Sequence, residues 1–371
     1  MPLPRPLVSV IIPAWNAAAH LQETIDSVLR QTIQSFELIV VDDGSSDDTA
    51  AIAASAETRD RRIRLVRRAN AGVGAARNAG IQLARGEFIA PLDADDLWSP
   101  KKIEKQIARL EHAGPRAGLA YCWSRNIDRN GRVISWAHPC RIEGHVLPAL
   151  LLGNLAGNAS VPLFRASALH AVGPYLNRDE QDGAQGCEDW DLNIRIAENF
   201  ELRCVPEYLV GYRQSPSGMS LNAHAMLRSY ETTIRRARQR NPGLSPQLLL
   251  WSRSRFYVYL ASKCYSWSDY AGALSFTART LRLDPLAWLN RRHYRLGLLS
   301  VAHLLSRGML RRHRSPPPVT TDNDPLFRVT PAAFPPPSTL FALLERRRLS
   351  VAMGAHPHSG SAAAKARPVF G

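Results

Sequence analysis

Short apolar runs alternate with longer amphipathic segments over the first 113 residues of the chain. The apolar runs have strand length and are rich in Val, Ile and Leu, so we expect strands at residues 7–12, 36–41, 63–66 and 87–92. The segments between them predict helices near residues 20–31, 48–56, 73–84 and 99–111. This alternation indicates an α/β fold with a doubly wound, mostly parallel sheet that helices cover on both faces.

Two of these helices have recognisable starts. Ser99-Pro100 predicts an N-cap residue followed by a proline in the first turn, and Asp47 or Asp48 can cap the helix after the second strand.

The pattern becomes mixed after Gly118. We expect short strands at residues 119–123, 132–136, 201–205 and 208–212, and helices at 145–152 and 188–199. After Asn222 the strand pattern ends, and residues 228–312 predict helices with breaks at 241–243 and 284–285. We expect the mixed segment, residues 118–213, to shape the acceptor side of a site.

One segment of the helical part, residues 257–285, resembles a single tetratricopeptide unit. One unit does not make an array, so we favour a helical hairpin packed on the preceding domain over a peptide-binding scaffold. Residues 296–310 could form a basic helix on a membrane surface or a capping helix over the hairpin. Proline runs after Ser315 indicate a disordered tail. The predicted parts are a catalytic domain at 1–224, a helical region at 225–314 and a tail at 315–371.

Composition narrows the cellular setting. The five cysteines are scattered without a C-x-x-C pair, which argues against a disulfide framework and a zinc site and favours a reducing cytosol. We find no signal peptide, no run long enough to span a bilayer and no nucleic-acid-binding motif. Residues 225–371 hold 23 Lys and Arg against 6 Asp and Glu, so they carry more than the whole net charge of +15. That half could face an anionic membrane or partner, or could be a solvated helical surface.

Three carboxylates follow the strand at residues 87–92. Asp93 and Asp95 are two positions apart, so both side chains can point to one ligand if the segment is extended. Carboxylate oxygens at the carboxyl end of a strand suit Mn²⁺ or Mg²⁺ holding a diphosphate. Alone, the pair could equally be an acidic loop before Ser99.

Polar residues also follow the first two strands. Asn16 ends the run Pro13-Ala14-Trp15-Asn16, and Asp42 and Asp43 end the second strand. A carboxylate here can accept a hydrogen bond from a nucleobase or a ribose hydroxyl, although Asp-Asp-Gly-Ser is as often a simple turn.

The glycine-rich segment 70–80 fits a dinucleotide-binding motif poorly, because Arg77 occupies the last glycine position and the segment follows the third strand. Its glycines could bring backbone close to a ligand or a helix close to the sheet. Arg77 could contact a diphosphate or pair with an aspartate.

Glu188 and Asp189 begin a predicted helix. The helix dipole favours acidic residues there, and a carboxylate at this junction could also take a proton from an attacking hydroxyl.

Together these motifs resemble those of the family 2 glycosyltransferases, in order and spacing, over about residues 7–220. The resemblance implies a GT-A fold that binds a nucleotide-sugar, usually a UDP-sugar, and transfers the sugar with inversion. It implies that Asp189 is the catalytic base with Glu188 beside it, and that Asp95 binds Mn²⁺ or Mg²⁺. It further implies nucleotide-sugar contacts, with Asp43 at the base and Asp93 at the ribose, for Pro13, Ala14, Asn16, Asp43, Gly72, Arg77, Asp93, Ala94 and Arg213.

The chain lacks the Q-x-x-R-W motif and membrane spans of the family's processive members, so we expect single transfers. The family usually has glycine where Cys187 stands. The implied partners are a nucleotide-sugar donor and a sugar, lipid-linked or glycan acceptor, in polysaccharide or glycan biosynthesis. We expect a cytoplasmic protein with peripheral contact to the inner face of an anionic membrane, and no nucleic-acid partner.

Two other functions fit parts of the pattern. A catalytically idle domain could act as a scaffold through the helical region, although the intact acidic set argues against it. A nucleotidyltransferase also uses paired carboxylates and a metal.

Overall fold

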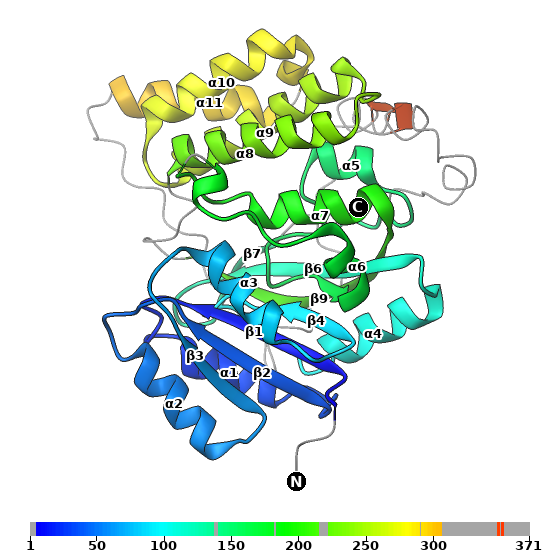
Figure 1. The fold of residues 1–371 in the computed structure, drawn as a ribbon. Helices are drawn as coiled ribbons and strands as arrows, with labels where there is room; N and C mark the ends of the chain where they lie inside the picture. The colour runs from blue at the N-terminus through cyan, green and yellow to red at the C-terminus, as the bar shows by residue number, and fades with distance from the viewer. Residues whose placement is uncertain are drawn as a thin grey trace.

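The computed structural model describes residues 5–136, 140–181, 183–214, 222–289, 291–305, 347–348 and 350–351. Within this part the strands form a nine-stranded sheet, flanked by helices and extended at one side by a helical layer (Figure 1). The strand order along the sheet is β3-β2-β1-β4-β8-β6-β9-β5, with β7 paired to β6.

The first half of the sheet is parallel, as the alternating pattern predicts. The strands are β1 (Val8–Ala14), β2 (Phe36–Asp42), β3 (Ile63–Arg67) and β4 (Phe88–Pro91), with β1 between β2 and β4. The connecting helices are α1 (Leu21–Leu29), α2 (Thr49–Arg59) and α3 (Val73–Leu83). Figure 1 shows α1 and α2 on one face of these strands and α3 on the other. The doubly wound arrangement is therefore confirmed.

The second half is mixed. Its elements are β5 (Leu97–Trp98), α4 (Lys102–Ala113), β6 (Ala117–Ile127), β7 (Val133–Trp136), α5 (Leu147–Leu152), β8 (Leu163–Arg165), α6 (Ala166–Val172), the 3₁₀ turn η1 (Asp179–Gln181), α7 (Glu188–Asn199) and β9 (Glu201–Arg213). Strand β8 pairs antiparallel with both β4 and β6, so it joins the two halves of the sheet. The elements β5, β8 and α6 were not predicted.

The prediction of two strands at 201–205 and 208–212 is wrong, because β9 runs unbroken from Glu201 to Arg213. Pro206 lies within it and cannot donate a ladder hydrogen bond. The pairing of β9 with β6 shifts register between Tyr121 and Trp123, opposite Cys204 and Tyr208. This irregularity accommodates the proline without ending the strand.

The helix starts give one correction and one confirmation. Helix α4 begins at Lys102, after the N-cap residue Lys101 and without a side-chain cap, whereas Ser99 continues the β5–β9 pairing, with its amide donating to Leu209 O (2.9 Å). At α2 the N-cap residue is Asp48, whose side chain makes no capping bond, but the carboxylate of Asp47 before it accepts a hydrogen bond from the Thr49 amide at 3.0 Å, so Asp47 satisfies a donor at the helix start.

The C-terminal part is helical, with breaks where they were predicted. It comprises α8 (Ala223–Arg240), α9 (Pro246–Ser266), α10 (Tyr270–Leu283), the 3₁₀ segment η3 (Pro285–Leu289) and α11 (Arg291–Leu305). Helices α9 and α10 pack together, α8 packs on α7, and α9 packs on α5. Of the predicted helix 296–310, residues up to 305 are helical, and the rest of it lies outside the described residues, as do residues 315–346, 349 and 352–371 of the predicted tail.

Within the described helices, none is long and apolar enough to cross a membrane.

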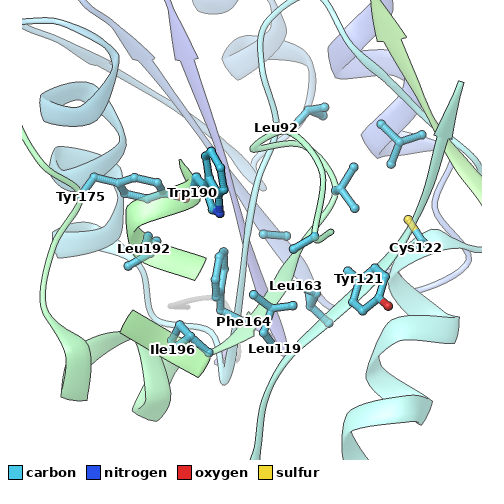
Figure 2. Close-up of a cluster of buried hydrophobic side chains, with 14 of the residues drawn as sticks. Leu92, Leu119, Tyr121, Cys122, Leu163, Phe164, Tyr175, Trp190, Leu192 and Ile196 are labelled. Carbon is cyan, nitrogen blue, oxygen red and sulfur yellow. The ribbon is translucent and has the colours of Figure 1, made fainter. Parts of the chain in front are cut away.

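One part of the core lies between the sheet and α7. Figure 2 shows Trp190, Leu192 and Ile196 of α7 facing Phe164 of β8 and Leu119 of β6. All five side chains are buried. Because Glu188 and Asp189 occupy the first turn of this helix, its packing sets where both carboxylates lie.

Candidate active site

The ends of β1 and β2 are joined directly. The Asp43 amide donates to Ala14 O at 2.8 Å, and Pro13 is in register with Val41. Beyond them the Asn16 amide donates to Ser45 Oγ (3.0 Å), and Asn16 Oδ1 accepts from the Ser46 amide (2.9 Å). The structure thus brings Pro13, Ala14, Asn16 and Asp43 together at one edge of the sheet.

Asp43 holds the glycine-rich loop. Its carboxylate accepts hydrogen bonds from the Ala71 amide (3.2 Å) and the Gly72 amide (2.8 Å), and it pairs with Arg68 at 3.2 Å. Gly72 has φ +92°, a conformation that favours glycine, and it stands immediately before α3. Asp43 therefore fixes the loop that opens α3, with 2% of its surface exposed.

Within α3, glycine permits close contact with the sheet. A Cβ added at Gly80 would lie 2.4 Å from Ile11 Cγ2. Of the two roles considered for these glycines, helix-to-sheet packing applies at this position.

The three carboxylates after β4 differ in their surroundings. Asp96 is fully buried and accepts hydrogen bonds from the Ser160 hydroxyl, the Asn158 amide and the Arg213 backbone amide, at 2.5, 2.7 and 2.8 Å. Asp93 and Asp95 are partly exposed. Burial, and then the neighbouring Asp93 charge, raise the pKa of Asp95 to about 6. Asp96 thus anchors the turn, and Asp93 and Asp95 face outward from it.

Arg77 connects the carboxylate turn to α7. Its Nη2 lies 2.6 Å from Asp93 Oδ1, and its Nη1 lies 3.0 Å from Glu188 Oε1. The guanidinium is 2% exposed, lies 5.2 Å from the centre of the Tyr175 ring, and has its pKa raised by the two carboxylates despite burial. Of the two roles considered for Arg77, the structure shows pairing with carboxylates.

Glu188 and Asp189 are inequivalent. Glu188 accepts from Arg77 and, through Oε2, from the Gly186 amide at 2.8 Å. Asp189 accepts only the amide of its neighbour Trp190, at 2.7 Å, among the described residues. Burial, and then the Glu188 charge, raise the pKa of Asp189 to about 8. Asp189 is therefore the carboxylate of this pair that is poised to take a proton near neutral pH.

Arg213 and Ala94 connect the Asp93–Asp96 turn to helix α1. Arg213 Nε donates to Asp95 O at 2.7 Å, and Arg213 Nη2 pairs with Glu23 at 2.8 Å. The Ala94 carbonyl accepts the Thr24 hydroxyl at 3.0 Å. Arg213 is 3% exposed, so its contacts in the structure are with the protein.

The residues present fit a divalent cation. No group of three His, Cys, Asp or Glu side chains that could hold a metal occurs among the described residues, and the side-chain carboxylate of Asp95 accepts no hydrogen bond from another described residue. A partly buried carboxylate with a raised pKa, next to a second carboxylate, gains from a nearby cation. Mg²⁺ typically takes one or two carboxylates and completes its shell with phosphate oxygens and water.

Three side chains near these residues were not named as site residues from the sequence. Trp15 is 60% exposed just after the buried strand β1, and that exposure was not readable from its position in the motif. Tyr259 and Lys263 come from α9, and the packing of the helical layer brings Tyr259 within electrostatic reach of Asp189.

A comparison with protein families matches the part of the chain that holds most of these residues. A family model described as "Glycosyl transferase family 2" matches residues 9–161, which include β1 to β6 and the Asp93–Asp96 turn. The segment 9–161 belongs to glycosyl transferase family 2. In this family 2 segment lie all the candidate site residues except Glu188, Asp189 and Arg213, which follow it.

Curated relatives match the same part of the chain. Chondroitin synthase from Escherichia coli is 38% identical over 193 residues, which cover 52% of this chain and 27% of the relative. The uncharacterized glycosyltransferase RT0329 from Rickettsia typhi is 40% identical over 134 residues, which cover 36% of this chain and 41% of the relative. The chain therefore spans well under half of either relative.

Solved structures extend the likeness in fold beyond the family 2 segment. The crystal structure of S. aureus TarS aligns with a TM-score of 0.53 and 16% identity, covering 81% of this chain and 54% of that chain. TarS 1-349 in complex with UDP aligns with a TM-score of 0.51 and 17% identity, covering 82% of this chain and 93% of that chain. The fold is the GT-A fold, as the resemblance implied.

Proposed function

We propose that the chain is an inverting glycosyltransferase that moves a sugar from a nucleotide-diphosphate sugar to an acceptor hydroxyl. The observation that carries this proposal is the position of Arg77, whose Nη2 lies 2.6 Å from Asp93 and whose Nη1 lies 3.0 Å from Glu188. This pairing supports a single site that contains the candidate diphosphate carboxylates and, next to Glu188, the candidate base Asp189. The family 2 segment and the GT-A fold support the same function.

The donor end would lie over β1 and β2. Asp43 and the loop it holds would receive the nucleobase, Trp15 would present its exposed indole to the base, and Asp93 would face the ribose. A UDP-sugar is the donor we propose, because TarS 1-349, which shares this fold, was solved in complex with UDP.

Asp95 would hold Mn²⁺ or Mg²⁺ together with the donor. When bound, the cation would neutralise the charge of the departing diphosphate. No other residue needs to protonate that leaving group.

Asp189 would act on the acceptor. Its carboxylate would take the proton of the acceptor hydroxyl while that oxygen attacks the anomeric carbon, and the bond from that carbon to the diphosphate would break on the opposite face. One displacement of this kind inverts the anomeric centre. The proton ends on Asp189 and the electron pair on the diphosphate, so no covalent intermediate is needed.

The setting follows from the relatives. Chondroitin synthase and the glycosyltransferases among the relatives support a role in polysaccharide or glycan biosynthesis. We propose single transfers, because the chain lacks the Q-x-x-R-W motif, and a glycan or lipid-linked acceptor. We propose a cytoplasmic enzyme, with its basic C-terminal half in peripheral contact with an anionic membrane.

The test is a donor screen. Release of nucleoside diphosphate is followed from UDP-, GDP- and dTDP-sugars with Mn²⁺, with Mg²⁺ and with EDTA. We expect metal-dependent release from one donor, its loss in Asp95→Ala and Asp189→Ala, and its retention in Asp179→Ala, which removes an exposed carboxylate outside the site.

Two results would contradict the proposal. The absence of both release and UDP binding would favour the idle scaffold, and pyrophosphate release from a nucleoside triphosphate would favour a nucleotidyltransferase.

A further inference from the structure

Helix α9 carries an aromatic and a basic side chain on the same face, close to the end of β9. Tyr259 and Lys263 are four residues apart, so they share one face of the helix. The Lys263 ammonium lies 5.8 Å from the centre of the Tyr259 ring. Both residues lie outside the family 2 segment, and neither has a role in the proposed displacement.

A continuous set of ring contacts places Tyr259 beside α7. Trp190, which follows Asp189, lies 5.9 Å from Phe256 between ring centres, and Phe256 lies 5.7 Å from Tyr259. Burial, and then Cys187 and Asp189, raise the pKa of Tyr259. Its hydroxyl is therefore within electrostatic reach of the candidate base. Tyr259 is nevertheless 39% exposed, so a ligand can contact its ring.

Lys263 is placed by the end of β9. Its Nζ lies 3.3 Å from Gln214 Oε1, and the preceding residue, Arg213, donates its amide to Asp96. Lys263 therefore lies beside the residue that follows β9 as well as near Tyr259.

The Lys263 charge has no compensating anion in the described part of the chain. The partners that the structure gives it are a neutral amide and an aromatic ring, and no described Asp or Glu pairs with it. Burial lowers its pKa, because the charged form is poorly solvated. A partly buried ammonium in this position gains from an anionic ligand.

We propose that Tyr259 and Lys263 form the acceptor subsite, and that the acceptor is a sugar carrying an anionic group, either a carboxylate or a phosphate. The sugar ring packs on Tyr259, and the anion accepts a hydrogen bond from Lys263. Exposed aromatic faces with a few polar groups are usual in ligand sites, and a lysine suits an anion of either shape. This inference rests on the proposed function, because it names the acceptor of that same site.

Three matched probes test the proposal: a p-nitrophenyl glucoside, the corresponding glucuronide and the phosphate monoester of the glucoside. Their binding to the full chain is titrated by saturation-transfer NMR, with and without UDP and Mn²⁺. We expect one or both anionic probes to bind about 10-fold or more tightly than the neutral one, as a charge-assisted hydrogen bond provides. The tighter of the two identifies the anion as carboxylate or phosphate.

Variants separate the two contacts. Lys263→Met should remove the advantage of the anionic probes, whereas Lys101→Met, which removes an exposed lysine charge on another element, should preserve it. Tyr259→Ala should weaken all three probes by about 3- to 10-fold, and Tyr259→Phe should restore them.

Equal binding of the three probes, absence of binding by all three, or an anionic advantage that survives Lys263→Met would overturn the proposal. Failure of the proposed function is a separate result. It would be seen as the absence of UDP binding to the wild-type chain in the presence of Mn²⁺.

Discussion

The Arg77 guanidinium lies 3.0 Å from Glu188, although the two residues are 111 positions apart in the chain. Arg77 belongs to α3 in the family 2 segment, and Glu188 is the first residue of α7 beyond it. The same guanidinium lies 2.6 Å from Asp93. One buried cation therefore sets the spacing between the donor carboxylates and the helix that carries the candidate base.

Loss of the Arg77 guanidinium should destabilise the fold. Arg77→Met leaves Asp93 and Glu188 without their counter-charge, and breaking a buried pair in this way costs about 3–5 kcal/mol. Urea denaturation followed by circular dichroism measures the change. Arg61→Met, at an exposed residue, should change the free energy of unfolding by less than about 0.5 kcal/mol. Equal effects of the two substitutions would contradict a structural role for Arg77.

Asp189→Asn should reduce turnover about 100-fold or more, as loss of a general base does. The wild-type kcat/KM should fall as pH drops below about 8, because the pKa of Asp189 is raised to about 8 and the protonated carboxyl cannot accept the acceptor proton. The variant should lack this dependence. A pH profile of the wild type that is flat from 6 to 9 would rule out Asp189 as the base with that pKa.

The same pKa shift predicts a change in stability. The folded state keeps a proton on Asp189 between about pH 4 and 8 that the unfolded chain has lost, so its free energy of unfolding falls as pH rises through this window. Asp189→Asn has no such dependence. Thermal melts should therefore show the variant to be more stable than the wild type at pH 9, and the difference should vanish near pH 4.

Alanine substitution should impair ligand binding at Asp95 and stability at Asp96. Asp95→Ala should abolish Mn²⁺-dependent UDP binding with little loss of stability, because its carboxylate supports no other described residue. Asp96→Ala leaves three donors, on Ser160, Asn158 and Arg213, without an acceptor, at about 1–3 kcal/mol for each buried group. Calorimetry with UDP and denaturant melts separate the two effects, and strong Mn²⁺-dependent UDP binding by Asp95→Ala would refute the metal assignment.

The helical layer should be required for activity. Phe256 of α9 stacks on Tyr230 of α8 with ring centres 4.1 Å apart and contacts Trp190 of α7. Phe256→Ala should cost about 3–5 kcal/mol and lower kcat, because it removes support from the helix that carries Asp189. Leu298→Ala, at a 66% exposed residue of α11, should change neither. An unaltered kcat in Phe256→Ala would show that the layer does not position the base.

The parallel half of the sheet and its strand-end residues could be predicted because they depend on local patterns. Apolar runs in β1, β2 and β4 define the strands, and parallel strands bring their carboxyl ends to one edge, where Asn16, Asp43 and Asp93 lie. β8 was missed because three residues are too few to show a period. β9 was divided in two because Pro206 suggested a break that its irregular pairing with β6 absorbs.

The rest of the site depends on contacts between distant parts of the chain. No local pattern pairs Arg77 with Glu188, or shows that Asp96 is buried beneath Arg213 while Asp95 is not. Tyr259 and Lys263 lie on a helix with buried residues on several sides, so its sequence alone does not show which face meets α7. The division at residues 224 and 225 stays a prediction, although α8 and α9 pack directly on α7 and α5.

The contact between Arg77 and Glu188 also constrains how such enzymes can diversify. Recombination that exchanged everything after residue 161 with a relative would bring in a new acceptor half, but it would succeed only where the incoming α7 supplied an acid to meet Arg77. Donor and acceptor specificity could then evolve as separate modules, provided that this one ion pair is inherited from both parents.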